Sequence, residues 1–424
     1  MRSDSFGPGG AAREGRDRSG GPGGSRSGGG RPRRGTGGAP ERGRSRGQRH
    51  PGPPRAPRRQ RPERATEQRG TEEPQEKVPA GVTRMFASVV PGLAPLVVRE
   101  LEQLDGVRVT DSGFDGRSDL ILFDVDRGRR DAVWTLRTVE DLFVEVGRTM
   151  RSSGDRPHWI AGRVWRPERV EKALSVWSAQ VRPLAGAMSY RVIARVLQEQ
   201  SFLRTDLRKS LGRSVSRDRP KWKVADPAQI EVWISEYRQG RLIAGLRLSD
   251  ASMRQHQGRR VERSGALRPT VAAMMVGLAG DPDGVLLDPC CGSGTVPAEA
   301  LAAGWEGAEG RDIDPEAVAA AEQNVPRGAV RTGDARDLGL PDASVGAVVS
   351  NLPFGQQYGV QGGMAAWLTD VLAEAARVTR PGGRVVLLAP EIPREAVPEG
   401  LRLRSRDPIR LLGTRTTLWV YDRG

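Results

Sequence analysis

Hydrophobic and polar positions follow regular patterns only from Val82 onward. The first patterned stretch combines short apolar runs, which predict strands, with apolar residues at helical spacing, which predict helices. The predicted strands are 85–90, 120–126 and 142–148, and the predicted helices are 91–104, opened by Pro91, and 131–139. A β-α-β-β-α-β order is typical of a small ferredoxin-like sandwich of one antiparallel sheet and two helices.

A second mixed stretch follows. An apolar run predicts a strand at 190–196, and two runs on either side of Gln239-Gly240 predict a β-hairpin. Between them, leucines at four-residue spacing predict a helix whose surface also carries basic residues. The leucines are Leu203, Leu207 and Leu211, and the basic residues are Arg204, Arg208, Lys209 and Arg213. With KWK at 221–223 this helix offers a phosphate-binding face, although charge alone favours an ordinary solvated surface.

The last 160 residues alternate helices with short, fully apolar strands. Predicted helices are 267–280, 317–324 and 366–379, and predicted strands are 285–289, 347–351, 384–390 and 416–422. Such alternation predicts an α/β domain with a parallel, doubly wound sheet. Ligands of these sheets bind beyond the carboxyl ends of the strands, so the chemistry is expected there.

Composition separates the amino-terminal segment from the rest of the chain. Residues 1–82 hold 19 Lys and Arg against 9 Asp and Glu, with 19 Gly, 11 Pro and one aromatic residue, Phe6. A segment with so little apolar surface cannot offset the entropy of ordering its backbone, so we predict a disordered basic tail. Two interpretations of this charge are equally supported. The tail binds a polyanionic partner, or it is an Arg/Gly-biased segment that only increases solubility.

Several classes of protein are excluded by composition. No apolar run approaches the ~20 residues of a membrane span, and the amino terminus lacks the apolar core of a secretory signal. The two cysteines, Cys290 and Cys291, are adjacent, and the three histidines are scattered, so no zinc cluster is expected. We therefore predict a cytoplasmic protein with no membrane partner and no metal. Its oligomeric state does not follow from the sequence.

A glycine-rich loop directly follows the strand at 285–289, in the sequence DPCCGSGT at 288–295. Gly292 and Gly294 let the backbone approach a ligand closely at the tip of that strand. A dinucleotide-binding fingerprint needs a third glycine where Pro297 stands, and a P-loop needs Gly-Lys-Ser/Thr, which is absent. The loop therefore belongs to another kind of nucleotide site.

Acidic residues follow this loop at two further strand ends, Asp312 with Asp314 and then Asp334. A carboxylate at the second strand end can accept both hydroxyls of a ribose. The ordered set resembles the S-adenosylmethionine site of class I methyltransferases, which implies that Asp334 receives the adenine amino group. The implied cofactor-binding residues are Asp288, Gly292, Gly294, Asp312 and Asp334.

The fourth strand ends in SNLPFG at 350–355, the most specific motif of the chain. It resembles the Asn/Asp-Pro-Pro-Tyr/Phe motif of methyltransferases that act on exocyclic or amide nitrogens. The resemblance implies that the Asn351 side chain and the Leu352 carbonyl accept hydrogens of the target amine. Pro353 would stiffen the turn, and Phe354 would stack on an extruded base. The motif has leucine at 352 where proline is usual. In this respect it is similar to the version found in THUMP-bearing tRNA guanine-N2 methyltransferases.

The segment 83–250 resembles the ferredoxin-like plus THUMP module of RNA-modifying enzymes, through RMFASVVPGLAPLVVRELEQL, SYRVIARV and FLRTDLRKSLGRSV. The predicted organisation is thus a tail (1–82), an α+β RNA-binding module (83–250) and a Rossmann-like class I methyltransferase domain (251–424). The implied activity is methyl transfer from S-adenosylmethionine to guanine N2 in RNA, with tRNA favoured. An rRNA guanine-N2 methyltransferase, a DNA adenine methyltransferase and a non-catalytic RNA-binding protein are the alternatives.

Overall fold

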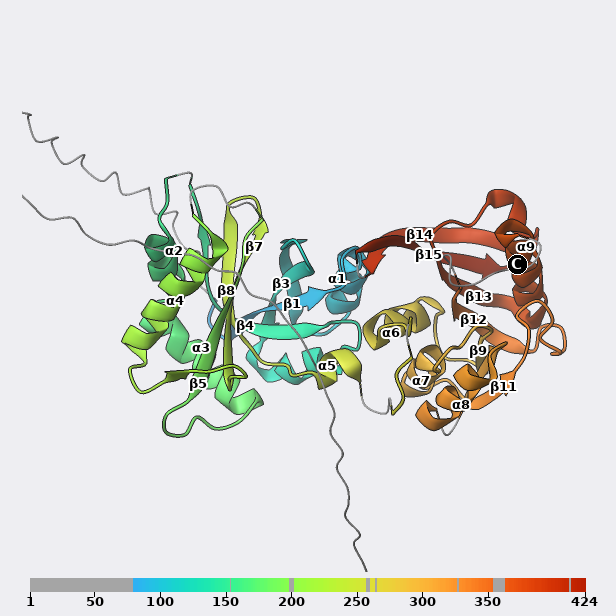
Figure 1. Cartoon of the computed structure of the whole chain (residues 1–424), viewed down its shortest axis with the longest axis horizontal. Coiled ribbons are helices and arrows are strands. Elements are labelled where there is room, and N and C mark those ends of the chain that lie inside the picture. Colours follow the sequence, from blue (N-terminus) through green and yellow to red (C-terminus); the bar gives the residue numbers. More distant parts are fainter. Residues whose placement is uncertain are drawn as a thin grey trace, which may run out of the picture. The chain divides into compact units, whose positions relative to one another are not determined.

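The computed structural model describes residues 79–152, 154–197, 202–256, 260–263, 265–325, 328–353, 363–411 and 413–424. Within these ranges the chain forms two β-sheets, the first ending before residue 250 and the second beginning after residue 280 (Figure 1). Nearly all of the predicted tail, 1–82, lies outside the described residues. Across the part that is described, no helix combines the length and the apolar character that crossing a membrane requires.

In the described part of the chain, the first sheet is eight-stranded, in the order β2-β3-β1-β4-β8-β7-β5-β6. Antiparallel pairing of β4 with β8 joins the two mixed stretches of the sequence into one continuous sheet. The strands are β1 (Val82–Val89), β2 (Val107–Phe114), β3 (Asp119–Asp126), β4 (Asp141–Met150), β5 (Ser189–Arg195), β6 (Lys223–Val224), β7 (Ile230–Arg238) and β8 (Arg241–Arg247).

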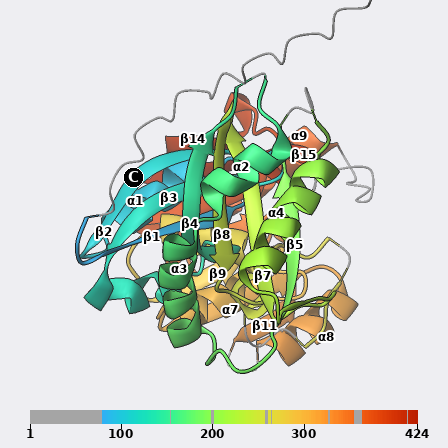
Figure 2. The same cartoon turned by 90° about the vertical axis from the view of Figure 1, so that its left-hand side faces the viewer.

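Four helices of the described residues pack on this sheet, and α2, α3 and α4 lie across its β4, β8 and β5 region (Figure 2). They are α1 (Ala94–Glu102), α2 (Pro157–Val164), α3 (Pro167–Gln180) and α4 (Arg204–Asp218). Proline stands in the first turn of α1, α2 and α3, where its missing N–H costs no hydrogen bond. Leu207 and Leu211 of α4 are fully buried, as their spacing predicts, whereas Leu203 precedes the helix and is exposed.

The helix predicted at 131–139 is wrong. Residues Arg127–Thr135 form a 3-10 helix, η1, and the chain is extended again by Leu136. Only Val133 of η1 is buried, so the segment lacks the apolar stripe that would hold an α-helix against the sheet. Gly128 near its start further weakens the helical preference.

The second sheet is seven-stranded over the described residues, in the order β11-β10-β9-β12-β13-β15-β14. The first five strands are parallel, and β15 pairs antiparallel with β13 and β14. Its elements are α6 (Pro269–Leu278), β9 (Val285–Asp288), α7 (Thr295–Ala302), β10 (Gly307–Asp312), α8 (Pro315–Asn324), β11 (Ala329–Thr332), β12 (Val345–Asn351), α9 (Met364–Val378), β13 (Thr379–Ala389), η2 (Arg394–Ala396), β14 (Leu401–Leu411) and β15 (Thr414–Arg423).

Both faces of this sheet are covered, which explains why its central strands β9 and β12 are mostly apolar. Leu286 of β9 packs into the same core as helices α6 and α7, whereas its neighbour Leu287 packs into the core that contains α9. Val348 and Val349 of β12 divide between the two cores in the same way. Alternate side chains of a strand point to opposite faces, so this division is the signature of a doubly wound sheet. The predicted fold class is confirmed.

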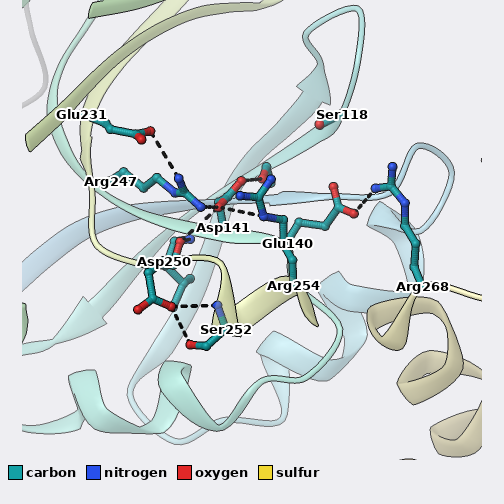
Figure 3. Close-up of polar contacts among 12 residues, drawn as sticks. Ser118, Glu140, Asp141, Glu231, Arg247, Asp250, Ser252, Arg254 and Arg268 are labelled. Carbon is teal, nitrogen blue, oxygen red and sulfur yellow. Dashed lines mark hydrogen bonds and ion pairs between the residues drawn. The ribbon is translucent and has the colours of Figure 1, made fainter. Parts of the chain in front are cut away.

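Polar contacts hold the connection between the two sheets (Figure 3). Asp141, the first residue of β4, accepts a hydrogen bond from Ser249 Oγ at 3.2 Å and forms an ion pair with Arg247 Nη2 at 2.6 Å. At the far end of the connection, Arg268 donates to the carboxylate of Glu140. The residues around 250 and those just before α6 are therefore both anchored at the start of β4. The short helix α5 (Ser252–Gln255) lies between these anchors.

Candidate active site

The glycine-rich loop occupies residues 289–294, between the end of β9 and the start of α7. Gly294 is the residue before the helix and has φ +83°, a left-handed conformation that favours glycine. A Cβ at Gly294 would lie 2.7 Å from Val325 Cγ2, so the loop packs tightly there. Gly292 also has positive φ, +52°, but a Cβ there would meet no atom within 4 Å. Gly294 therefore shapes the loop, and Gly292 leaves open space above it.

Asp288 lies under this loop and is buried, with 2% of its surface exposed. Its Oδ1 accepts hydrogen bonds from Ser350 Oγ at 2.7 Å and from the Cys290 amide at 3.1 Å. Burial raises the pKa of the Asp288 carboxyl to about 7, and the neighbouring Asp312 carboxylate acts in the same direction. The two hydrogen bonds oppose this rise because they stabilise the ionised form.

The contact between Ser350 and Asp288 joins the two motifs that the sequence analysis singled out. Ser350 is fully buried at the end of β12, one residue before Asn351, and Asp288 ends β9 just before the glycine-rich loop. The two residues are 62 positions apart in the chain. Serine at this position carries no signal of its own in a single sequence, so sequence reasoning did not identify Ser350.

Asp312 ends β10 and lies beside the glycine-rich loop, as the sequence predicts. Its Oδ2 accepts the Gly292 amide at 2.8 Å, and its Oδ1 accepts the Asp314 amide at 3.0 Å. Asp314 has a different role, because its side chain caps α8 through the Glu316 amide and pairs with Arg263 at 2.6 Å. Of the two acidic residues at this strand end, Asp312 is the one that faces the loop.

Asp334 follows β11, and its carboxylate pairs with Arg336. The Arg336 Nη2 atom lies 2.6 Å from Asp334 Oδ2, and Nε lies 3.1 Å from both carboxylate oxygens. This hydrogen bonding holds the pKa of Asp334 below its ordinary value. The backbone amide of Arg336 also donates to Oδ1 at 2.9 Å. The proposed acceptor of the adenine amine is therefore ionised and held in one orientation.

Asn351 ends β12, and Leu352 and Pro353 follow it outside any helix or strand. Asn351 pairs with Leu388 of the neighbouring strand β13, and the Leu352 amide donates to the Leu388 carbonyl at 3.2 Å. Leu352 is buried, and Asn351 and Pro353 are half-buried. In the part of the chain that the structure describes, no hydrogen bond engages the Asn351 side chain. Phe354, the predicted stacking residue, lies outside the described residues.

Asn324, at the end of α8, is a further residue that sequence reasoning missed. Its Nδ2 donates to the Ser293 carbonyl at 2.9 Å and to the Val261 carbonyl at 2.8 Å. Its Oδ1 accepts the amides of Arg260 and Val261 at 2.6 and 2.9 Å. One side chain thus holds the glycine-rich loop to the connection between the two sheets. No sequence signal marks it, because its partners are 31 to 64 positions away.

Glu299 of α7 contacts Arg137, which lies before β4 of the first sheet, and His256, which lies in the connection between the sheets. It thereby holds α7, the helix after the glycine-rich loop, against these segments. Its carboxylate accepts from Arg137 Nε at 2.8 Å and contacts His256 Nδ1 at 2.7 Å. Burial raises the pKa of Glu299, but the hydrogen bonds from His256 and Arg137 outweigh it, so that its pKa lies below the ordinary value. Glu299 is therefore an ionised, buried anchor for α7.

The two cysteines of the loop are unsuited to nucleophilic chemistry. Burial raises the pKa of both thiols, and the nearby carboxylates of Asp288 and Asp312 raise them further. A thiol needs a lowered pKa to react as a thiolate at neutral pH. Cys291 is buried and packs against Gly310 of β10, where an added Cβ would lie 2.9 Å from its Sγ.

These residues fit S-adenosylmethionine. The loop turns on two glycines of positive φ and leaves open space above Gly292. Carboxylates stand at three consecutive strand ends, and Asp312 already contacts the loop amide at 292. Asp288, Gly292, Gly294 and Asp312 form one cluster, with Asp334 at the next strand end.

Comparison with known proteins supports this assignment. Residues 257–399 match a protein family described as RMKL-like, methyltransferase domain. Over 81% of its length the chain shares its fold with the crystal structure of TrmN from Thermus thermophilus, which is covered completely, with a TM-score of 0.64 and 23% identity. The predicted class I methyltransferase domain is confirmed, and with it S-adenosylmethionine as the methyl donor of this class.

Two curated relatives carry more specific names. The tRNA (guanine(6)-N2)-methyltransferase of Thermus thermophilus is 26% identical over 57% of this chain and 74% of its own length. The U6 snRNA (guanine-N(2))-methyltransferase THUMPD2 of Bos taurus is 33% identical over 30% of this chain. The chain spans only 26% of the length of THUMPD2. The resemblance to THUMP-bearing guanine-N2 methyltransferases is thus confirmed as a similarity.

Proposed function

We propose that this protein is an S-adenosylmethionine-dependent RNA methyltransferase that modifies the exocyclic N2 of a guanosine in tRNA. The observation that carries the proposal is the junction of the two motifs. Asn351 follows directly after Ser350, whose hydroxyl lies 2.7 Å from the carboxylate that begins the cofactor loop. A group acting on the substrate amine and a group supporting the methyl donor are thereby held in one framework.

The residues around Asn351 perform the chemistry on the substrate side. The amine of guanine is a weak nucleophile because its lone pair is delocalised into the ring. The Asn351 side-chain oxygen and the Leu352 carbonyl accept its two hydrogens and localise the lone pair on nitrogen. Pro353 fixes the backbone so that both acceptors keep their directions. S-adenosylmethionine, when bound, supplies an electrophilic methyl group.

The residues of the loop hold the donor. Asp312 accepts the ribose hydroxyls, and Asp334 receives the adenine amine. Asp288 supports the loop from below, through its bond with the amide of Cys290. We assign Phe354 the stacking of the extruded base, as its motif implies. None of these roles requires a metal or a covalent enzyme intermediate.

The segment 83–250 is proposed to bind the RNA, and 251–424 to carry out the transfer. The Thermus thermophilus relative whose name specifies tRNA aligns with 57% of this chain, whereas the relative whose name specifies U6 snRNA aligns with 30%. The longer alignment favours tRNA over other structured RNAs. A cytoplasmic location and an accessory, charge-based role for residues 1–82 complete the proposal.

Methylation of defined RNAs tests this function. Purified protein is incubated with S-adenosylmethionine and unmodified transcripts of tRNA, of rRNA fragments and of U6 snRNA, and the nucleosides are then measured by mass spectrometry. We expect N2-methylguanosine in tRNA, at a single position, and its loss with Asn351→Ala. Formation of N6-methyladenosine, or methylation confined to rRNA or U6 snRNA, would contradict the proposal.

A further inference from the structure

A cavity of about 570 Å³ lies beside the hairpin of β14 and β15, away from the cofactor loop. The hairpin contributes Pro408, Arg410, Arg415 and Thr417 to its wall, and Pro390, just after β13, contributes another part. The loop at 91–92 borders it as well, and the Arg410 amide donates to the Pro91 carbonyl at 2.8 Å. Gly92 packs so closely that a Cβ would lie 2.4 Å from the Pro408 carbonyl oxygen.

The two arginines of this cavity face each other across the hairpin. Arg410 and Arg415 are direct partners in the antiparallel register, so their side chains leave the same face of the sheet. Directly opposed side chains have Cβ atoms about 4.5–5.5 Å apart, and like charges on two such side chains are destabilising. Among the described residues, neither guanidinium forms an ion pair with a carboxylate. Both arginines are exposed and project from the same place on the sheet, so a bound anion would reduce the repulsion between them.

Among the described residues that line the cavity, the carboxylate is that of Asp119, and it already accepts hydrogen bonds. Asp119 Oδ2 accepts the amides of Gly92 at 2.7 Å and Ala94 at 3.3 Å, so it caps the start of α1. Burial is the largest influence on Asp119 and raises the pKa of its carboxyl. Its hydrogen bonds therefore point toward the backbone of α1, and the arginines keep their charge available to a ligand.

The cavity lies at the same edge of the sheet as the proposed methyl-transfer site. Asn351 of β12 is in register with Leu388 of β13, which is in register with Leu418 of β15. Arg415 stands three residues beyond Leu418, toward the carboxyl edge of the parallel strands. With strands about 4.8 Å apart and a rise of about 3.4 Å per residue, the Asn351 and Arg415 Cα atoms are separated by roughly 14 Å. That separation corresponds to a few nucleotides of an RNA strand.

We propose that Arg410 and Arg415 form a phosphate-binding notch for the RNA backbone next to the target guanosine. The inference rests on the proposed function for the identity of the RNA, and it adds a contact in the catalytic domain outside the segment 83–250. Two guanidinium groups on one face suit successive backbone phosphates, since arginine forms bidentate bonds to phosphate oxygens. The notch holds the strand while the guanine is turned toward Asn351.

The test is RNA binding by the full-length protein, with a matched control in the same hairpin. The test variant is Arg410→Gln with Arg415→Gln, and the control is Arg402→Gln with Arg404→Gln. The control arginines are exposed, belong to β14, and pair with Asp422 instead of lining the cavity. Both variants lose two positive charges, so the comparison separates a site from general electrostatic attraction.

Binding of unmodified tRNA is measured by fluorescence anisotropy between 50 and 300 mM salt. The test variant should bind about ten-fold or more weakly. The slope of log K against log salt should fall in magnitude by about 1.4–1.8, since each lost phosphate contact removes about 0.7–0.9. Affinity for S-adenosylmethionine should stay at the wild-type value, and the melting temperature should not fall, because the variant also removes the repulsion between the two arginines. Arg410→Lys with Arg415→Lys should recover the salt slope and part of the affinity.

The outcomes separate the notch from the proposed function. Equal losses in the test and control variants, or a wild-type slope in the test variant, would overturn the notch while leaving guanine-N2 methylation standing. Wild-type protein that binds tRNA through these arginines but forms no N2-methylguanosine would overturn the function and leave the notch as an RNA-binding site. If methylation proceeds normally in the test variant at low RNA concentration, the notch does not hold substrate.

Discussion

The buried carboxyl of Asp288 makes a quantitative prediction about stability and pH. Asp288 has a folded-state pKa of about 7, against 3.8 for an ordinary aspartate, because burial disfavours the charged form. The unfolded chain therefore releases this proton at lower pH than the folded chain. The stabilising contribution of the protonated carboxyl is complete below pH 3.8, and it declines as pH rises until it is lost above about pH 7.

The magnitude follows from the two pKa values. Each unit of difference corresponds to 1.36 kcal/mol, so the ionised carboxylate lowers the free energy of unfolding by about 4 kcal/mol at pH 8. Asp288→Asn removes the titration while preserving local geometry, because both hydrogen bonds from Ser350 and Cys290 end on the single oxygen Oδ1. Between pH 4.5 and 7.5, the difference in free energy of unfolding, variant minus wild type, should increase by about 3 kcal/mol.

Urea denaturation of both proteins, followed by circular dichroism at half-unit steps of pH, measures this difference. Ser350→Ala is the informative control. The Ser350 hydroxyl lowers the pKa of Asp288, so its removal should move the transition in the difference curve to higher pH. If Asp288→Asn and the wild type differ by a constant amount from pH 4.5 to pH 8, then Asp288 does not titrate in this range and the reasoning is refuted.

Four further predictions concern cofactor binding, catalysis and stability. Asp312→Ala removes the proposed ribose acceptor and the partner of the Gly292 amide. Calorimetry should therefore show S-adenosylmethionine binding at least about ten-fold weaker, and unchanged affinity would reject the assignment. Asn351→Ala should leave cofactor affinity intact but slow single-turnover methyl transfer by at least ~100-fold, about 2.7 kcal/mol, with Asn351→Asp recovering part of the loss; a wild-type rate would reduce the motif to a turn. Gly294→Ala should lower the free energy of unfolding by about 1–3 kcal/mol, because φ is positive and the Cβ would lie 2.7 Å from Val325 Cγ2. Gly292→Ala should cost less stability and more cofactor affinity, since its Cβ would enter open space, and the reverse ranking in thermal denaturation would contradict this assignment of roles.

The periodic parts of the chain were predictable because their pattern is local. The strands that end at Asp288 and Asn351 are buried on both faces, so nearly all of their positions are apolar and the pattern is unmistakable. The helix predicted at 131–139 was wrong because several apolar residues do not by themselves make an apolar stripe. Only Val133 of η1 is buried, so no α-helix is held against the sheet there. The arginine-rich strand β14 escaped prediction because its charges obscure the alternation, and only pairing with β15 defines it as a strand.

The sequence by itself determined which motifs the candidate site contains. The tertiary structure decided which residues from distant parts of the chain contact these motifs. The glycine-rich loop, the acids at strand ends and the motif at Asn351 are local signals, since each depends on neighbours in the chain. The hydrogen bond from Ser350 to Asp288, the anchoring of the loop by Asn324 and the opposition of Arg410 and Arg415 are not local. They depend on which strands and helices become neighbours, and that choice is made by burial of apolar surface across the whole domain, to which residues far apart in the sequence contribute together.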